Sequence, residues 1–184
     1  GYAGAGTVSI NIVNNTTEAQ ILDTIINDAT GDVTLSALDN TSIYTFAGAF
    51  AAGKKAGLGA AISVNTLLNE TTAAVEGSTI TTTGAFDAKA EESGTIVSLA
   101  AAGAGSDKIA IAGSVALNLF NNDIDAHVIN STITTGGAVV LTAKDKEISV
   151  ALGGGVAISK SSSAVGAAVG VNLIFNEVTS HVES

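Results

Sequence analysis

An N-x-x-x-N pair recurs at a nearly constant interval, and this recurrence constrains the fold more than any other feature. The pairs are Asn11/Asn15, Asn65/Asn69, Asn118/Asn122 and Asn172/Asn176, and their first members lie 54, 53 and 54 residues apart. Such a period is typical of repeat proteins. It predicts a single repeat array over residues 1–184, with units at 1–54, 55–107 and 108–160 and a partial unit at 161–184. We expect this array to be a segment of a longer protein.

The residues before each asparagine pair alternate between bulky apolar and small side chains. In the third unit Val115, Leu117 and Leu119 share one parity, and Ser114 and Ala116 share the other. A period of two is the signal of a β-strand, because successive side chains point to opposite faces. We expect the bulky side chains to fill one layer and the small ones to let a second layer approach closely.

The remaining segments are short, rich in Val, Ile and Thr, and separated by Gly, Asn, Asp, Ser and Lys. They predict an all-β fold with about five strands of roughly 4 to 11 residues per unit, including a polar turn at residues 39–41. The favoured architecture is a parallel β-helix-like β-solenoid in which each unit winds as two or three coils. The alternative is a stack of antiparallel hairpins, for which the GSDK sequence at residues 105–108 is a plausible turn.

A stacked repeat places equivalent asparagines above one another, where their amides can hydrogen-bond as a ladder. We therefore expect a structural role for all eight, which are Asn11, Asn15, Asn65, Asn69, Asn118, Asn122, Asn172 and Asn176. Asparagine at a strand end also satisfies backbone groups of a turn.

Composition restricts the partners of the chain. It has 17 acidic residues, seven lysines and no arginine, which gives a net charge of −10. Nucleic acids and anionic membranes are therefore expected to be repelled. The longest apolar run, at residues 164–175, is too short for a membrane-spanning helix, so no membrane insertion is expected. The chain contains no cysteine, so it has neither disulfides nor thiolate metal sites.

No combination of nucleophile, base and orienting residue recurs between units, so we expect no enzyme activity, no catalytic residues, no cofactor and no metal site. Residues 121–125 resemble part of a calcium loop, but their carboxylates are not repeated. His127 and His181 occupy the same repeat position on the outward parity, and we expect them to be exposed and solvated.

The fourfold VN-x-x-x-N block, the threonine-rich strand after it and the long Ala/Gly-rich strands together resemble the repeats of very large secreted bacterial surface proteins. These are haemagglutinin-like and autotransporter-type exoproteins, including adhesins and leukotoxin-like giant proteins. The resemblance implies a β-helical stalk at the bacterial cell surface, outside the cell, used for reach, adhesion or self-association. Its implied partners are neighbouring repeats of the parent chain, further copies of itself, or a cell-surface or glycan ligand.

The leading functional hypothesis is a non-catalytic structural or adhesive repeat segment of an extracellular bacterial surface protein. A self-assembling extracellular filament subunit is the alternative, because open strand edges offer docking surfaces. Two further hypotheses have less support. A carbohydrate-active enzyme would use Asp123 and Asp125, and an ice-binding solenoid would use the pairs Thr81/Thr83 and Thr132/Thr134.

Overall fold

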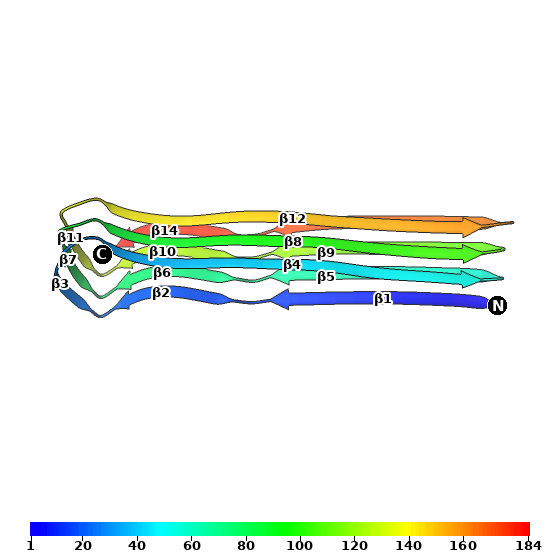
Figure 1. Ribbon diagram of the computed structural model, residues 1–184, viewed down its shortest axis with the longest axis horizontal. Coiled ribbons are helices and arrows are strands. Elements are labelled where there is room, and N and C mark those ends of the chain that lie inside the picture. Colours follow the sequence, from blue (N-terminus) through cyan, green and yellow to red (C-terminus); the bar gives the residue numbers. More distant parts are fainter.

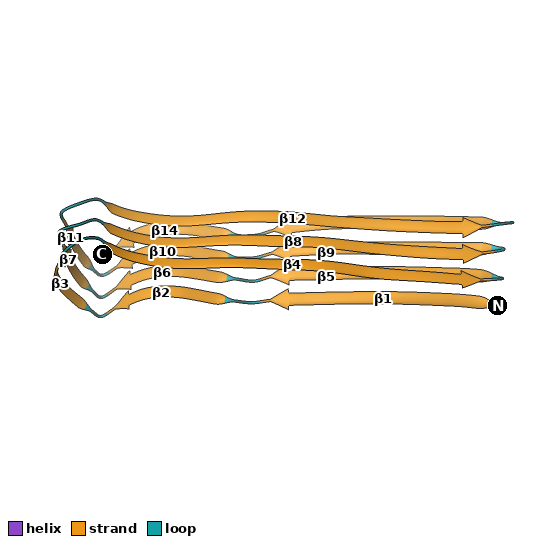
Figure 2. Cartoon of the chain, viewed as in Figure 1, coloured by secondary structure: helices purple, strands orange, loops and turns teal.

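The protein is a flat stack of coils. The computed structural model describes all 184 residues, and its only regular secondary structure is fourteen β-strands (Figure 2). The first coil consists of β1 (Tyr2–Val13), β2 (Thr16–Leu22), β3 (Ile25–Ala29) and β4 (Val33–Gly53). The next coils are β5 (Ala56–Leu67), β6 (Glu70–Glu76), β7 (Thr79–Thr82) and β8 (Phe86–Ser106), then β9 (Ile109–Phe120), β10 (Asp123–Ile129), β11 (Thr132–Thr135) and β12 (Val139–Ser159). The last residues form β13 (Ser163–Ile174) and β14 (Glu177–Glu183). No helix is present that could cross a lipid bilayer.

Equivalent strands of successive coils form four parallel sheets. Their strand orders are β1-β5-β9-β13, β2-β6-β10-β14, β3-β7-β11 and β4-β8-β12. In each complete coil the first two strands run in line along one face, the third turns the corner, and the fourth returns along the opposite face (Figure 1). The predicted all-β parallel solenoid is confirmed. The hairpin alternative is wrong, because every strand pairs in parallel with its equivalents in the neighbouring coils.

One repeat makes one coil, and not two or three as we expected. Asn11 pairs with Asn65, Asn65 with Asn118, and Asn118 with Asn172. A complete coil contains four strands instead of five, because the predicted polar turn at residues 39–41 lies inside the 21-residue strand β4. Asp39 and Thr41 point into the coil, where the Thr41 hydroxyl donates to Asp39 Oδ1 over 2.7 Å. Inward-facing polar residues within a strand thus gave a false indication of a turn.

The bulky side chains of the alternating runs face outward, which contradicts the expected packing. Ile10 is 63% exposed and Leu58 is 53% exposed, while Ala61 of the opposite parity is fully buried. The small residues, which alternate with the bulky ones, do face a second sheet, as expected. We call the sheets β1-β5-β9-β13 and β4-β8-β12 the two long sheets. At the end of the coil remote from β3, the interior between them is therefore lined by small residues, and their outer faces carry the large aliphatic side chains.

The interior narrows from the β3 end of each coil to the opposite end. The β3 end contains a cluster of large side chains that includes Phe86, Ile80 and Ile124, and the opposite end contains only alanines in its buried cluster. There the backbones approach so closely that a Cβ atom on Gly57 would lie 2.5 Å from the carbonyl oxygen of Gly105. The large side chains at the β3 end and the small ones at the opposite end thus give each complete coil a wedge shape.

Differences in repeat length are absorbed at the corners. β3 has five residues and β7 has four, and the pairing shifts by one residue between Ile26 and Ala29. Asp28, within this irregularity, has a φ of 57°, a conformation that Asp tolerates better than most residues. The long sheets keep their register on both sides of the irregularity.

Candidate functional site

The first asparagine of each pair forms a continuous amide ladder inside the stack. Nδ2 of Asn11 donates to Oδ1 of Asn65 over 2.9 Å. The bonds from Asn65 to Asn118 and from Asn118 to Asn172 are both 3.1 Å long. Asn65 and Asn118 are fully buried, so each amide that bonds to the next coil satisfies a group that water does not reach. The ladder therefore links all four coils through side chains.

The second asparagine of each pair makes a different connection. Oδ1 of Asn69 accepts from the backbone amide of Asn15 over 3.2 Å, and Oδ1 of Asn122 accepts from that of Asn69 over 3.0 Å. Asn176 accepts in the same way from Asn122 over 2.9 Å. These residues lie at the two-residue break between the first two strands of each coil. They replace the missing strand hydrogen bond and leave each Nδ2 free to donate into the interior.

These Nδ2 groups meet a band of inward-facing carboxylates, which we name the carboxylate band: Asp39, Glu92, Asp145 and Glu147. Asn69 donates to Asp39 over 3.2 Å and to Glu92 over 3.1 Å, and Asn122 donates to Glu147 over 2.8 Å. Glu92 is only 2% exposed. One oxygen on each of Glu92, Asp145 and Glu147 is buried without a hydrogen-bond partner. No basic side chain pairs with the band.

The environment of the carboxylate band favours protonated carboxyl groups. Burial raises the pKa of Glu92 to about 7, although the hydrogen bond from Asn69 opposes the change. Burial, followed by the charge of Asp145, raises the pKa of Glu147 to about 8. A neutral carboxyl group can donate its proton to a neighbouring carboxylate, which is how closely spaced acids coexist in an interior. We did not predict this band, although Asp39, Glu92 and Asp145 repeat at intervals of 53 residues and so carry a sequence signal.

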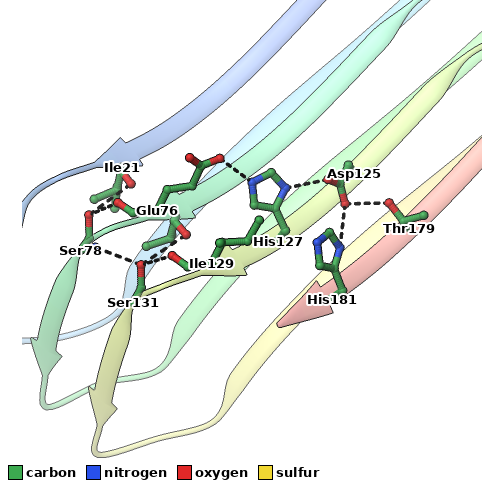
Figure 3. A network of polar contacts seen from close by, with 10 residues as sticks. Ile21, Glu76, Ser78, Asp125, His127, Ile129, Ser131, Thr179 and His181 are labelled. Carbon is green, nitrogen blue, oxygen red and sulfur yellow. Dashed lines mark hydrogen bonds and ion pairs between the residues drawn. The ribbon is translucent and has the colours of Figure 1, made fainter. Parts of the chain in front are cut away.

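A second polar network lies on the outer face of the sheet β2-β6-β10-β14 and is formed by residues of its strands β6, β10 and β14 (Figure 3). Nδ1 of His127 is 2.6 Å from Oδ2 of Asp125, and its Nε2 is 3.0 Å from Oε1 of Glu76. Nδ1 of His181 is 3.5 Å from Oδ1 of Asp125. The histidine rings of adjacent coils lie 5.4 Å apart between centroids. Side chains from three coils thus converge at one point.

The expectation of two solvated histidines is wrong for His127. This residue is only 8% exposed, because Glu76, Asp125 and His181 surround its ring. Burial alone would lower the pKa of His127, but the hydrogen bonds and charges of Glu76 and Asp125 outweigh burial and raise it. His181 remains partly exposed, with 43% of its side chain accessible. Glu76 was missed because it comes from the preceding coil, 51 residues away in sequence.

The other sequence motifs are separated or shifted by the fold. The calcium-like segment at residues 121–125 is divided between two faces, since Asn122 bonds to Glu147 inside while Asp123 and Asp125 lie on the outward face of β10. Thr132 pairs with Thr79 and Thr134 with Thr81. The threonine array is therefore Thr79/Thr81 beside Thr132/Thr134, and the predicted pair Thr81/Thr83 is displaced, because Thr83 follows the end of β7.

Comparisons with known proteins give no relative from which a function could be transferred. No protein-family model, curated protein or solved structure matches the chain. Its function must therefore be inferred from its own residues.

Proposed function

We propose that the chain is a non-catalytic structural and adhesive repeat segment of a large extracellular bacterial surface protein. The observation that supports this role is that each repeat adds one complete coil in register, so that length along the stack depends only on the number of repeats. The coils are linked by backbone pairing in four sheets and by the amide ladder. An arrangement of this kind suits a stalk, whose task is to set a distance.

This proposal predicts that a whole repeat can be removed without loss of the fold. Deleting residues 55–107 joins Lys54 to Lys108 and brings Asn118 opposite Asn11. We expect the shortened chain to keep a β-sheet circular dichroism spectrum and to lose about 5 Å along the stacking axis, the spacing of neighbouring strands. Small-angle X-ray scattering measures the change.

The control removes residues 55–94, a segment of 40 residues that is not a whole repeat. This deletion joins Lys54 to Thr95, in the middle of β8, so the inward side chains that follow the junction no longer align with those of the first coil, and we expect the product not to fold. The stalk proposal is rejected if both deletions behave alike, because the repeat would then not be the structural unit.

A second function, lateral self-association, is favoured by the outer faces of the two long sheets. The outward positions of β5, β9 and β13 carry no charged residue, and the same is true of β4 from Ser42 onward and the paired positions of β8 and β12. Phe50 on one face is 72% exposed. Uncharged apolar surfaces of this extent mark interaction sites. A second copy of the chain fits best, because its side chains repeat at the same coil spacing.

Self-association predicts that the chain forms dimers or larger assemblies that depend on concentration, measured by sedimentation velocity. The double substitution Ile62→Lys and Val115→Lys places charges on neighbouring outward positions of β5 and β9, and we expect it to weaken association at least tenfold. Thr83→Lys, at an exposed position beyond this face, is the control and should associate like the unmodified chain. A chain that stays monomeric at high concentration contradicts this second function.

A further inference from the structure

We propose that Asp125, His127 and His181 bind one divalent transition metal ion of the zinc class, and that the ion links the third coil to the fourth. The three residues come from two adjacent strands, since Asp125 and His127 lie on β10 and His181 lies on β14 (Figure 3). His127 and His181 are direct partners in the parallel pairing. The solenoid therefore places two imidazoles one coil apart, with a carboxylate beside both.

The distances suit a small ion with nitrogen and oxygen ligands. One ligand atom from each of the three residues lies within 4.8 Å of the others. Zinc binds histidine nitrogen and carboxylate oxygen at about 2.0–2.2 Å, so two ligands of a tetrahedral ion are separated by about 3.4 Å. The two carboxylate oxygens of Asp125 face different histidines, at 2.6 Å and 3.5 Å. Only small movements of side chains are needed to surround an ion.

Neighbouring groups hold the ligands in the orientation that a metal requires. Glu76 is hydrogen-bonded to Nε2 of His127 over 3.0 Å. This contact keeps a proton on Nε2 and leaves Nδ1 as the nitrogen that faces Asp125. A carboxylate on the far nitrogen of a histidine ligand is a recurring feature of zinc sites. The Thr179 hydroxyl also donates to Oδ1 of Asp125 over 2.7 Å, which fixes the carboxylate.

The ligand types select a metal class. Two imidazoles and one carboxylate favour zinc, cobalt, nickel or copper over calcium and magnesium, which prefer oxygen ligands. When the ion binds, the proton between His127 Nδ1 and Asp125 leaves to solvent, and the ion takes its place. The exposed side of His181 provides access for the ion and for a water molecule as fourth ligand.

The other coils contain no equivalent set, so one site per chain is expected. The residues aligned with His127 are Ala74 in the second coil and Gln20 in the first. The residue aligned with Asp125 in the second coil is Thr72. The first and second coils contribute strands to the same sheet but lack these ligands, so we expect no metal ion to bind there.

The test is a titration of the whole chain with zinc chloride by isothermal calorimetry, accompanied by cobalt chloride absorption in the visible range. We expect one equivalent of zinc to bind, an intense cobalt spectrum typical of tetrahedral nitrogen and oxygen ligands, and a higher melting temperature with zinc. His181→Gln should weaken zinc binding at least tenfold. This residue is partly exposed, so its replacement should leave the fold intact. Glu76→Gln should weaken binding by about tenfold or more, as second-sphere changes do.

The matched pair is Asp125→Asn and Asp123→Asn, which remove the same charge two residues apart on the same strand face. Asp125→Asn should weaken zinc binding at least tenfold, and Asp123→Asn should leave it unchanged. If Asp123→Asn weakens binding as much, or if His181→Gln binds zinc like the unmodified chain, the ion is held only by general attraction to the acidic surface and the proposal is wrong. It is also wrong if no saturable binding of one equivalent occurs.

Discussion

Gly59→Val should destabilise the protein by about 3 kcal/mol or more, although valine favours strands more than glycine does. Gly59 lies in β5 at a position that faces the interior of the coil. A Cβ atom there would overlap the backbone carbonyl group of Gly103 in β8. Backbone atoms cannot rotate away as a side chain can. The two sheets must therefore separate, and the alanine-lined contacts around the site are lost. Urea denaturation followed by circular dichroism measures the change.

The control for this prediction is the adjacent residue. Leu58→Ala removes a much larger group, but that group points outward and is half exposed, so the expected cost is about 1 kcal/mol or less. A stability of Gly59→Val equal to that of the unmodified chain would show that the sheets are further apart than described. A larger loss for Leu58→Ala than for Gly59→Val would mean that the strand faces are reversed.

The second large effect is a loss of stability as pH rises. The pKa of Glu92 is raised to about 7 and that of Glu147 to about 8, from an ordinary value of 4.5. Below pH 4.5 both groups are neutral in the folded and the unfolded chain, so their contribution is fully present. Between pH 4.5 and about 8 the unfolded chain loses these protons more readily, and the contribution disappears. The raised pKa of His127 acts in the same direction. For Glu92 alone the change is about 3 kcal/mol.

Urea midpoints between pH 5.5 and 9 should therefore fall steadily for the unmodified chain. Glu92→Gln keeps the size of the side chain and removes the buried charge, so it should be more stable than the unmodified chain at pH 9 and should flatten the pH profile. Glu91→Gln, the neighbouring residue on the outer face of β8, should leave the slope of the profile unchanged. A midpoint that rises toward pH 9 would show that the carboxylate band is stable in its ionised form.

The sequence was sufficient to predict which residues become neighbours, but not which face of each strand points inward. The asparagine interval correctly indicated that Asn65 and Asn118 lie in adjacent coils, because a constant period has few other structural explanations. In the alternating runs, however, both parities are uncharged, so hydrophobicity did not distinguish the two faces. Packing decides the question: two sheets at close range leave space for Ala61 but not for Ile62.

The candidate sites were harder to predict because their members come from different coils. In the sequence Asp39 resembles a turn residue, since only the folded chain brings Asn15 and Asn69 beside it. The sequence around His127 shows no partner for it, because Glu76 is 51 residues away. A motif confined to one short segment cannot predict a site whose residues come from different coils. The sequence signal for the carboxylate band is that Asp39, Glu92 and Asp145 occupy equivalent repeat positions, 53 residues apart.

The corners of the coils have a consequence for how such a chain can vary. A one-residue difference between β3 and β7 leaves the pairing of the long strands unchanged, because the excess is accommodated outside the flat faces. The turn that follows β12 is likewise one residue longer than the turn that follows β8, and β13 still pairs in step with β9. Whole peptides grafted at these bends would project sideways from the stack of coils, so new surface loops could be gained there without redesign of the buried layers.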